Sequence, residues 1–312
     1  MIGSLFSRRT ATAPWIAITT QSAAARLVQV MVAGSERRKV VTYQQVSAAS
    51  SREESLVRLR KEARSSPFRC SHLLQIGQYQ IQLAEAPAVP QQELRQAVRW
   101  KLKDLLDYPV EQATVDVVNV PGDRHTSSRG QYVLAVSASN DVVAEEMRVY
   151  RQANVPLHAI DIPEMAQRNV AALFEEPERA LALLAFTDRG GLLTFTSGGD
   201  LYLSRHTDIT PTQLNSSASD VREQAFDRLV LELQRSIDHF DRQFSYVSLS
   251  RLLVASHGVP NLVQDLAGSV DLPVEELRLT EAFDFSDVPD LQDESMQYAC
   301  LHLLGAALRL EG

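Results

Sequence analysis

One long amphipathic stretch constrains the fold more than any other part of this sequence. Between Phe226 and Phe240 apolar residues recur every three or four positions, the spacing of a helix that buries one face. These apolar residues are Phe226, Leu229, Val230, Leu233, Ile237 and Phe240. The opposite face carries charged side chains, among them Arg228 and Asp238. Because strand-like segments precede and follow this stretch, the sequence predicts the central helix of an α/β lobe.

Length, charge and cysteine content limit the class of protein. A chain of 312 residues exceeds the usual single-core domain, so two lobes are expected. The 31 basic and 39 acidic residues give a formal net charge of −8, which argues against a nucleic-acid partner, since such proteins usually carry a basic excess. With only two cysteines, Cys70 and Cys300, a reducing cytoplasm fits better than a disulfide framework. Apolar runs of 18 residues are absent, so no membrane span is expected.

Strands and helices alternate along the whole chain. The predicted strands are residues 15–18, 26–32, 40–46, 71–76, 79–83, 113–120, 132–137, 157–162, 180–186, 192–196, 201–204, 251–255 and 274–279. The predicted helices, besides the long one, are residues 52–64, 91–106, 141–152, 165–173, 260–266 and 296–310. Strands 71–76 and 79–83 are expected to pair with each other around Gly77. The polar connection at residues 174–179 is the predicted boundary between the lobes.

A search for catalytic motifs leaves the chemistry undetermined. The patterns HExxH, CxxC, GxSxG and GxxxxGK[ST] do not occur, and no pair of the seven histidines has metal-ligand spacing. Asp238, His239 and Asp241 form the nearest acid–base cluster, but a solvated helix face explains these residues more simply. Trp100 lies off the apolar stripe of its helix, which fits either packing against a neighbouring subdomain or contact with a partner.

Five stretches, in order along nearly the whole chain, together resemble one family. They are residues 93–120 (ELRQAVRWKLKDLLDYPVEQATVDVVNV), 158–170 (HAIDIPEMAQRNV), 192–206 (LLTFTSGGDLYLSRH), 231–240 (LELQRSIDHF) and 303–309 (LLGAALR). Their order resembles that of the PilM-like actin-fold family of type IV pilus assembly proteins, and most of all its MSHA-pilus branch. The fourth stretch is similar to the family's Glu-x-x-Arg-Ser helix, with Glu232, Arg235 and Ser236 in register.

The resemblance implies the fold and its division. The expected fold is α/β and actin-like (ribonuclease H-like), with two lobes around a cleft and a small α+β subdomain inserted in the first lobe. The first lobe would comprise residues 1–175 and 292–312, with the insert at about 88–156. The second lobe would comprise residues 180–291.

The same resemblance implies a nucleotide site, from which this sequence departs. In nucleotide-binding members two Asp-x-Gly loops hold phosphate and Mg²⁺, and a glycine pair approaches the adenosine. The residues at the corresponding positions here are Ala17, Thr19, Ala185, Thr187, Ser256, His257 and Gly258. We therefore expect no cofactor, no metal and no catalytic residue: a pseudo-ATPase. Asp188, followed by Gly190, keeps open the alternative of an ATP-binding switch or slow ATPase of pilus assembly or type II secretion.

A partner is implied as well. In the family, the cytoplasmic N-terminal tail of a PilN-like or MshJ-like bitopic inner-membrane protein docks between the insert and the first lobe, beside other proteins of the assembly platform. Helix 91–106 is a predicted wall of that groove. Trp100, Arg99 and Leu94 are the candidate partner-binding residues, because aromatic and arginine side chains commonly anchor such contacts. The chain would then be a cytoplasmic scaffold, peripheral at the inner membrane through its partner.

Overall fold

The computed structural model describes residues 15–21, 24–31, 37–47, 49–62, 68–122 and 131–309. A six-stranded sheet contains β1 (Trp15–Gln21), β2 (Ala24–Met31), β3 (Arg38–Val46), β4 (Arg69–Leu73), β8 (Ala159–Asp161) and β14 (Phe283–Asp284). A five-stranded sheet contains β9 (Ala180–Thr187), β10 (Gly190–Ser197), β11 (Asp200–Thr207), β12 (Leu249–Ala255) and β13 (Val274–Glu276). A three-stranded sheet contains β5 (Tyr79–Glu85), β6 (Ala113–Val120) and β7 (Tyr132–Ser139).

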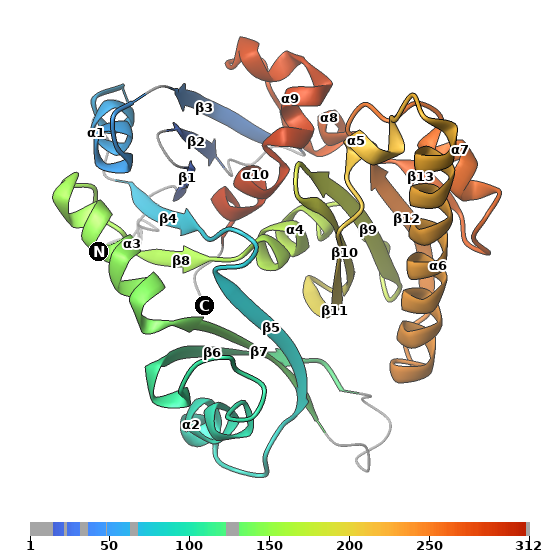
Figure 1. Cartoon of the computed structure of the whole chain (residues 1–312), viewed down its shortest axis with the longest axis horizontal. Helices are drawn as coiled ribbons and strands as arrows, with labels where there is room; N and C mark the ends of the chain where they lie inside the picture. Colours follow the sequence, from blue (N-terminus) through green and yellow to red (C-terminus); the bar gives the residue numbers. More distant parts are fainter. Residues whose placement is uncertain are drawn as a thin grey trace, which may run out of the picture.

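Helices cover these sheets and connect them (Figure 1). They are α1 (Arg52–Glu62), α2 (Gln91–Lys101), α3 (Asn140–Gln152), α4 (Pro163–Ala171), α5 (Pro211–Leu214), α6 (Ser219–Gln243), α7 (Leu262–Ala267), α8 (Leu279–Ala282), α9 (Glu294–Ala299) and α10 (Leu301–Ala307). Two 3₁₀ turns, η1 (Val110–Gln112) and η2 (Pro289–Gln292), complete the described elements. None of the helices within the described ranges is long and apolar enough to cross a membrane.

The two large sheets are built on the same plan. The strand orders are β3-β2-β1-β4-β8 in the first and β11-β10-β9-β12-β13 in the second, with β14 as an extra edge strand of the first. In each, the first three strands of the chain form an antiparallel meander, and the last two run parallel to the first strand. This duplicated α/β unit is the two-lobed actin-like fold that the resemblance implied.

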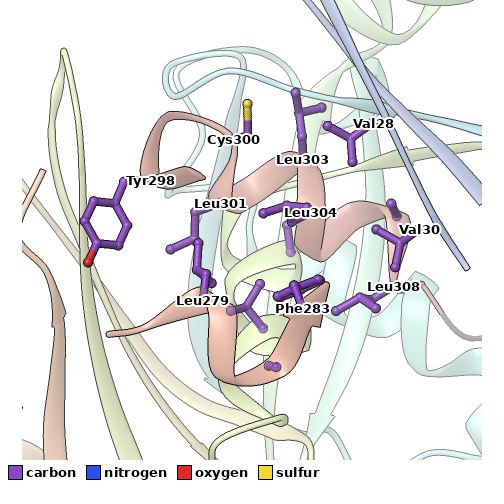
Figure 2. Packing of buried hydrophobic residues seen from close by; sticks show 14 of the residues in the cluster. Val28, Val30, Leu279, Phe283, Tyr298, Cys300, Leu301, Leu303, Leu304 and Leu308 are labelled. Atoms are coloured by element: carbon purple, nitrogen blue, oxygen red, sulfur yellow. The ribbon is translucent and has the colours of Figure 1, made fainter. Parts of the chain in front are cut away.

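Two helices, α4 and α10, lie between the large sheets (Figure 1). Helix α10 packs against β1, β2 and β4, whereas α4 packs against β9, β10 and β11, and the two helices pack against each other. Figure 2 shows the apolar side chain of Leu304 on α10 and, from the facing strand β2, those of Val28 and Val30. The order first sheet, α10, α4, second sheet therefore joins the two lobes through one continuous apolar cluster.

The long helix α6 covers the other face of the second sheet. Its buried residues include Leu229, Leu233 and Phe240, and the Phe240 ring stacks on Phe195 of β10 with centroids 4.9 Å apart. Aromatic pairs at such distances add to the stabilisation given by burial. The helix that the sequence predicted as central to a lobe is thus confirmed.

The small sheet has two differently covered faces. Helix α2 covers one face, where Leu94, Val98 and Leu102 pack against residues of β6 and β7. The opposite face packs on both lobes: Tyr79 belongs to a cluster with Ile162, while Leu134 belongs to the cluster of the second lobe. Strand β5 begins at residue 79, ahead of the segment 88–156. Helix α3 lies inside that segment and yet packs against the first lobe.

Four predicted elements, two strands and two helices, differ from the structure in their pairing or extent. Strands 71–76 and 79–83 exist but do not pair with each other, because β4 joins the first large sheet and β5 the small one. The helix predicted at 91–106 ends at Lys101 and continues as turns. The final helix, predicted as continuous over 296–310, is two helices that meet at Cys300.

The crossing of α4 and α10 depends on Gly305. A Cβ atom at this position would lie 1.9 Å from the Ala166 carbonyl oxygen of α4. We predict that Gly305→Ala destabilises the protein by about 1–3 kcal/mol or more, because the helices must move apart in a close-packed core. Thermal and denaturant unfolding measure the loss. Gly122→Ala is the matched control, since its Cβ would have no atom within 4 Å; equal stability of the two variants would contradict the prediction.

Candidate functional site

The alanines at the two expected phosphate-loop positions face the central helices. Ala17 of β1 is 0% exposed and Ala185 of β9 is 2% exposed, and both belong to the apolar cluster that includes Ala166 and Leu304. An ionised carboxylate at either position would lose its hydration without a charge partner on these surfaces. The local chemistry therefore favours apolar side chains where a nucleotide-binding member carries aspartate.

The turn between β9 and β10 is closed by its own residues. The Thr187 hydroxyl donates to the Gly190 carbonyl over 3.2 Å and accepts from the Arg189 amide, also over 3.2 Å. Gly190 has a φ of +132°, and a Cβ there would lie 2.0 Å from the Thr207 carbonyl oxygen. Asp188 lies in this turn, two residues before Gly190. This glycine is thus explained by the tight approach of β11.

Carboxylates lie beside the third expected loop, at Ser256, His257 and Gly258. The Ser256 hydroxyl donates to Glu276 Oε1 over 2.7 Å, and the Tyr298 hydroxyl lies 2.8 Å from the same oxygen and 3.2 Å from Glu294 Oε1. His257 and Gly258 both have positive φ values, 50° and 76°, so the backbone makes a tight turn here. Two carboxylates this close to the loop create a field that opposes a phosphate.

A buried carboxylate on α4 connects the small sheet to the second large sheet. Glu164 is 0% exposed in the first turn of α4. It accepts a 2.6 Å hydrogen bond from the Tyr79 hydroxyl of β5, and its other oxygen lies 2.6 Å from His206 Nε2 of β11. Charge-assisted hydrogen bonds of this kind are stronger than neutral ones. The insert and the second lobe are thus attached to one side chain of the central helix.

Gln167, one turn further along α4, makes a second buried link. Its amide nitrogen donates to the Leu183 carbonyl oxygen over 2.8 Å and lies 3.0 Å from Thr194 Oγ1, both in the second lobe. Its amide oxygen lies 3.0 Å from His302 Nε2 on α10. Burial is the main reason that the pKa of His302 falls from 6.5 to about 4. The imidazole is therefore neutral, and its Nε2–H donates to Gln167.

A further buried network lies where β4 meets α3. The imidazole of His72 lies between the Tyr150 hydroxyl, 2.9 Å from Nδ1, and Glu146 Oε2, 3.2 Å from Nε2. Glu146 is also paired with Arg52 of α1. Burial, with a smaller effect of the Arg52 charge, lowers the pKa of His72 to about 3. These residues hold α1 and α3 to the sheet and carry no unsatisfied charge, so their arrangement is structural.

The two buried histidines predict sensitivity to acid. The pKa values of His72 and His302 are about 3 and 4 in the folded protein, against 6.5 for a free imidazole. Between these values the unfolded chain binds a proton at each histidine and the folded chain does not. Stability is then complete above pH 6.5 and falls as the pH drops toward 4, by roughly 2 kcal/mol per histidine at pH 5. Urea unfolding between pH 7.5 and 5 measures the slope. His302→Gln should remove about half of it, and an unchanged slope would contradict the assignment.

The three predicted partner-binding residues differ in their surroundings. Leu94 is 6% exposed in the core under α2, and Arg99 donates from Nε to the Val110 carbonyl oxygen over 2.8 Å. Trp100 is 55% exposed on the outer side of α2. Because α2 covers the face of the small sheet that points away from the lobes, this surface is separated from the junction between insert and first lobe. The docking role of the three residues remains a prediction. Of the three, Trp100 has the side chain that is exposed enough to contact a partner.

A cavity of about 970 Å³ lies elsewhere in the first lobe. It is bounded by α3, β8 and the end of α1. Its lining is mainly apolar, with arginines at two positions, and includes Arg60, Phe68, Met147, Arg151, Leu157 and Ile160. Nothing in the sequence singled out this surface, because its apolar residues come from three separate segments.

Comparisons with known proteins agree with this architecture. No family model and no curated protein sequence matches the chain. Among solved structures it is similar to a chain of a PilM–PilN type IV pilus biogenesis complex, with 17% identity over 95% of this chain and 98% of that chain and a TM-score of 0.75. It also matches the cytoplasmic domain of EpsL, an inner-membrane component of the type II secretion system of Vibrio cholerae, at 12% identity, 94% and 95% coverage and a TM-score of 0.47. The predicted actin-like fold is confirmed.

The alanine at the first loop position can be tested directly. We predict that Ala17→Asp destabilises the protein by several kcal/mol, because a fully buried apolar site must accept a carboxylate or its protonated form. Ala144→Asp on the exposed side of α3 provides the control for the same chemical change. A stable Ala17→Asp protein that gained Mg-ATP binding would contradict this view of the site.

Proposed function

We propose that this chain is a PilM-like scaffold of a type IV pilus assembly platform, working without nucleotide. Within that family we place it with the MshI proteins of the MSHA pilus. Its partner would be a PilN-like or MshJ-like bitopic inner-membrane protein, bound through the cytoplasmic tail of that protein. The chain would then be cytoplasmic and held at the inner membrane by this contact.

Two observations support the family and the partner. The fold covers nearly the whole length of a chain from a PilM–PilN type IV pilus biogenesis complex. The five stretches that resemble the family occur in the same order in the sequence. The net charge of −8 gives no general attraction to nucleic acid, so it favours a protein partner over a nucleic-acid partner.

The observation that carries the pseudo-ATPase proposal is the burial of Ala17 and Ala185 in the apolar cluster between the lobes. In an actin-like ATPase the nucleotide itself joins the two lobes across the cleft. Here protein groups make that connection. Besides Glu164 and Gln167, Arg189 of the second lobe donates to the Ile76 carbonyl oxygen over 3.2 Å. Lobe closure in this chain therefore needs no bound phosphate.

The second candidate is a nucleotide-binding switch or slow ATPase. It is favoured by one feature, the sequence Asp188-Arg189-Gly190 in the β9–β10 turn, which retains an Asp-x-Gly spacing in the expected region. It requires this turn to supply the phosphate contacts without the first loop. The same experiment distinguishes the two candidates.

We predict that Mg-ATP does not bind and does not alter partner binding. Titration of labelled ATP with Mg²⁺ should give no affinity tighter than about 10 μM, near 7 kcal/mol. A labelled peptide should be made with the cytoplasmic N-terminal tail sequence of a PilN-like inner-membrane protein from the same organism. It should bind with the same Kd in the presence and absence of millimolar Mg-ATP. Tight ATP binding would support the switch, and no peptide binding would contradict the scaffold.

A further inference from the structure

The small sheet belongs to the first lobe by its chain connections. The chain enters it from β4 of the first large sheet, through a turn at Gly77 with a φ of 94°. It leaves through α3, which packs against the first lobe and leads back to β8 of the same large sheet. Both ends of the insert are therefore attached to one lobe, and any contact that it makes with the second lobe spans the two.

The strands of the small sheet run from one lobe to the other. At one end, Tyr79 of β5 pairs with Ala138 of β7 and packs with Ile162 of the first lobe. At the other end, Val120 of β6 pairs with Tyr132 of β7, and Val120 is buried in the apolar cluster of the second lobe. Strand β6 has 8 residues, so the sheet is about 24 Å long. Its length thus bridges the two lobes.

A hydrogen bond and apolar packing hold the end of the small sheet that lies on the second lobe. The Tyr246 hydroxyl, from the segment between α6 and β12, donates to the Pro121 carbonyl oxygen over 2.6 Å. Leu134 of β7 is buried in the second-lobe cluster, and Val118 of β6 packs against that cluster while partly buried. Because non-covalent contacts alone hold this end, it is the end that can be released.

This contact lies apart from the helices that join the lobes. Among the described residues, the apolar cluster around α4 and α10 has no member from β5, β6 or β7. Two bodies that meet in one packed layer can rotate or slide about that layer, as in hinge and shear motions. A second attachment, at Pro121, removes this freedom because it lies away from the layer.

We propose that the small sheet is a strap that sets the angle between the lobes. Its Tyr79 end stays on the first lobe, and its Pro121 end holds the second lobe through Tyr246 and the apolar contact. Release of the Pro121 end lets the second lobe turn about the crossing of α4 and α10 while that crossing stays packed. The chain thereby has a closed and an opened state, and the strap contacts set the balance between them. This inference goes beyond the scaffold function, because it concerns the motion of the lobes.

Spin labels on the full chain measure the angle between the lobes. Arg60→Cys on α1 and Leu231→Cys on α6 place one label on each lobe, and both positions are exposed. A second pair, Leu231→Cys with Gln264→Cys on α7, lies within the second lobe and reports whether that lobe is folded. The native Cys70 and Cys300 are 0% exposed, so they should not react with the label. Double electron–electron resonance gives the distance distribution of each pair.

One substitution should release the strap outright. Val118→Asp puts a carboxylate into the apolar contact with the second lobe, where its charge is unfavourable. It should shift most of the interlobe distribution to a new distance and leave the pair within the second lobe unchanged. Asn119→Asp is the matched control, because it changes the next residue of the same strand at an exposed position. It should leave both distributions as in the unaltered chain.

A milder double variant weakens the strap without burying a charge. Tyr246→Phe with Val118→Ala removes the hydroxyl that binds Pro121 and part of the apolar contact, and should raise the share of the opened distance roughly tenfold. Its matched control is Tyr43→Phe with Val117→Ala. The Tyr43 hydroxyl donates within β3, and Val117 packs on the α2 side of the small sheet, so the control should leave the interlobe distribution unchanged.

An unchanged interlobe distribution in Val118→Asp, with the second-lobe pair intact, would overturn the proposal. If Val118→Asp also alters the second-lobe pair, that variant has lost its fold and the double variant decides. Equal interlobe distributions in the double variant and its control would then overturn the strap. Neither peptide nor nucleotide enters the measurement, so its failure leaves the proposed function standing, and failure of the peptide to bind leaves the strap standing.

Discussion

The backbone contact between α4 and α10 is the constraint on which the rest of this structure depends. Gly305 lets α10 approach the Ala166 carbonyl closely, and the Gly305 carbonyl in turn accepts a 2.9 Å hydrogen bond from the Asn169 side chain. Because each helix also packs on one of the two large sheets, the spacing of this pair sets the distance between the lobes. A thicker crossing would separate the sheets and open the apolar cluster that runs through both.

The position of α4 between the two large sheets explains the hydrogen bonds that its polar side chains make. Glu164 and Gln167 lie one turn apart on a helix that places Ala166, Val170 and Ala171 in the core, and both are completely buried. Burying these groups is unfavourable unless every polar atom finds a partner. Their partners come from β5, β10, β11 and α10, so the arrangement that satisfies them is also the arrangement that fixes three sheets at once. Polar side chains here give the lobes a single relative orientation, which apolar packing alone specifies less sharply.

Local patterns in the sequence predicted most helices and strands. They did not predict which strands pair with each other when those strands are separated in the chain. The stripe from Phe226 to Phe240 predicted α6. The partners of β4 and β5 could not be read locally, because Gly77 with its φ of 94° fits a hairpin as well as a change of sheet. The break at Cys300 could not be predicted either, because the apolar stripe of the sequence continues across it although the backbone of α9 ends there and α10 begins.

For the site too, the sequence showed which residues are present but not how they are buried or which residues they contact. The loss of aspartate and glycine at the expected loops was visible in the sequence, but the apolar cluster around Ala17 and Ala185 was not. Glu164 was overlooked because a glutamate in the first turn of a helix is ordinary, and only its zero exposure makes it informative. Nothing in the sequence connects His206 with His302, because 96 positions separate them. The fold brings both to α4, where His206 contacts Glu164 and His302 contacts Gln167.

The proposed scaffold function, if it works without nucleotide, places particular demands on the surface of this chain. If the cleft no longer changes shape with a nucleotide, specificity for a partner must come from surfaces that are complete in the resting fold. The edge of β8 meets that condition, because its position is set by β4 on one side and by the buried His72–Glu146–Arg52 network that holds α3 beside it. The outer face of α2 presents the exposed side chain of Trp100. The cavity beside β8 has an apolar lining together with two exposed arginines, Arg60 and Arg151.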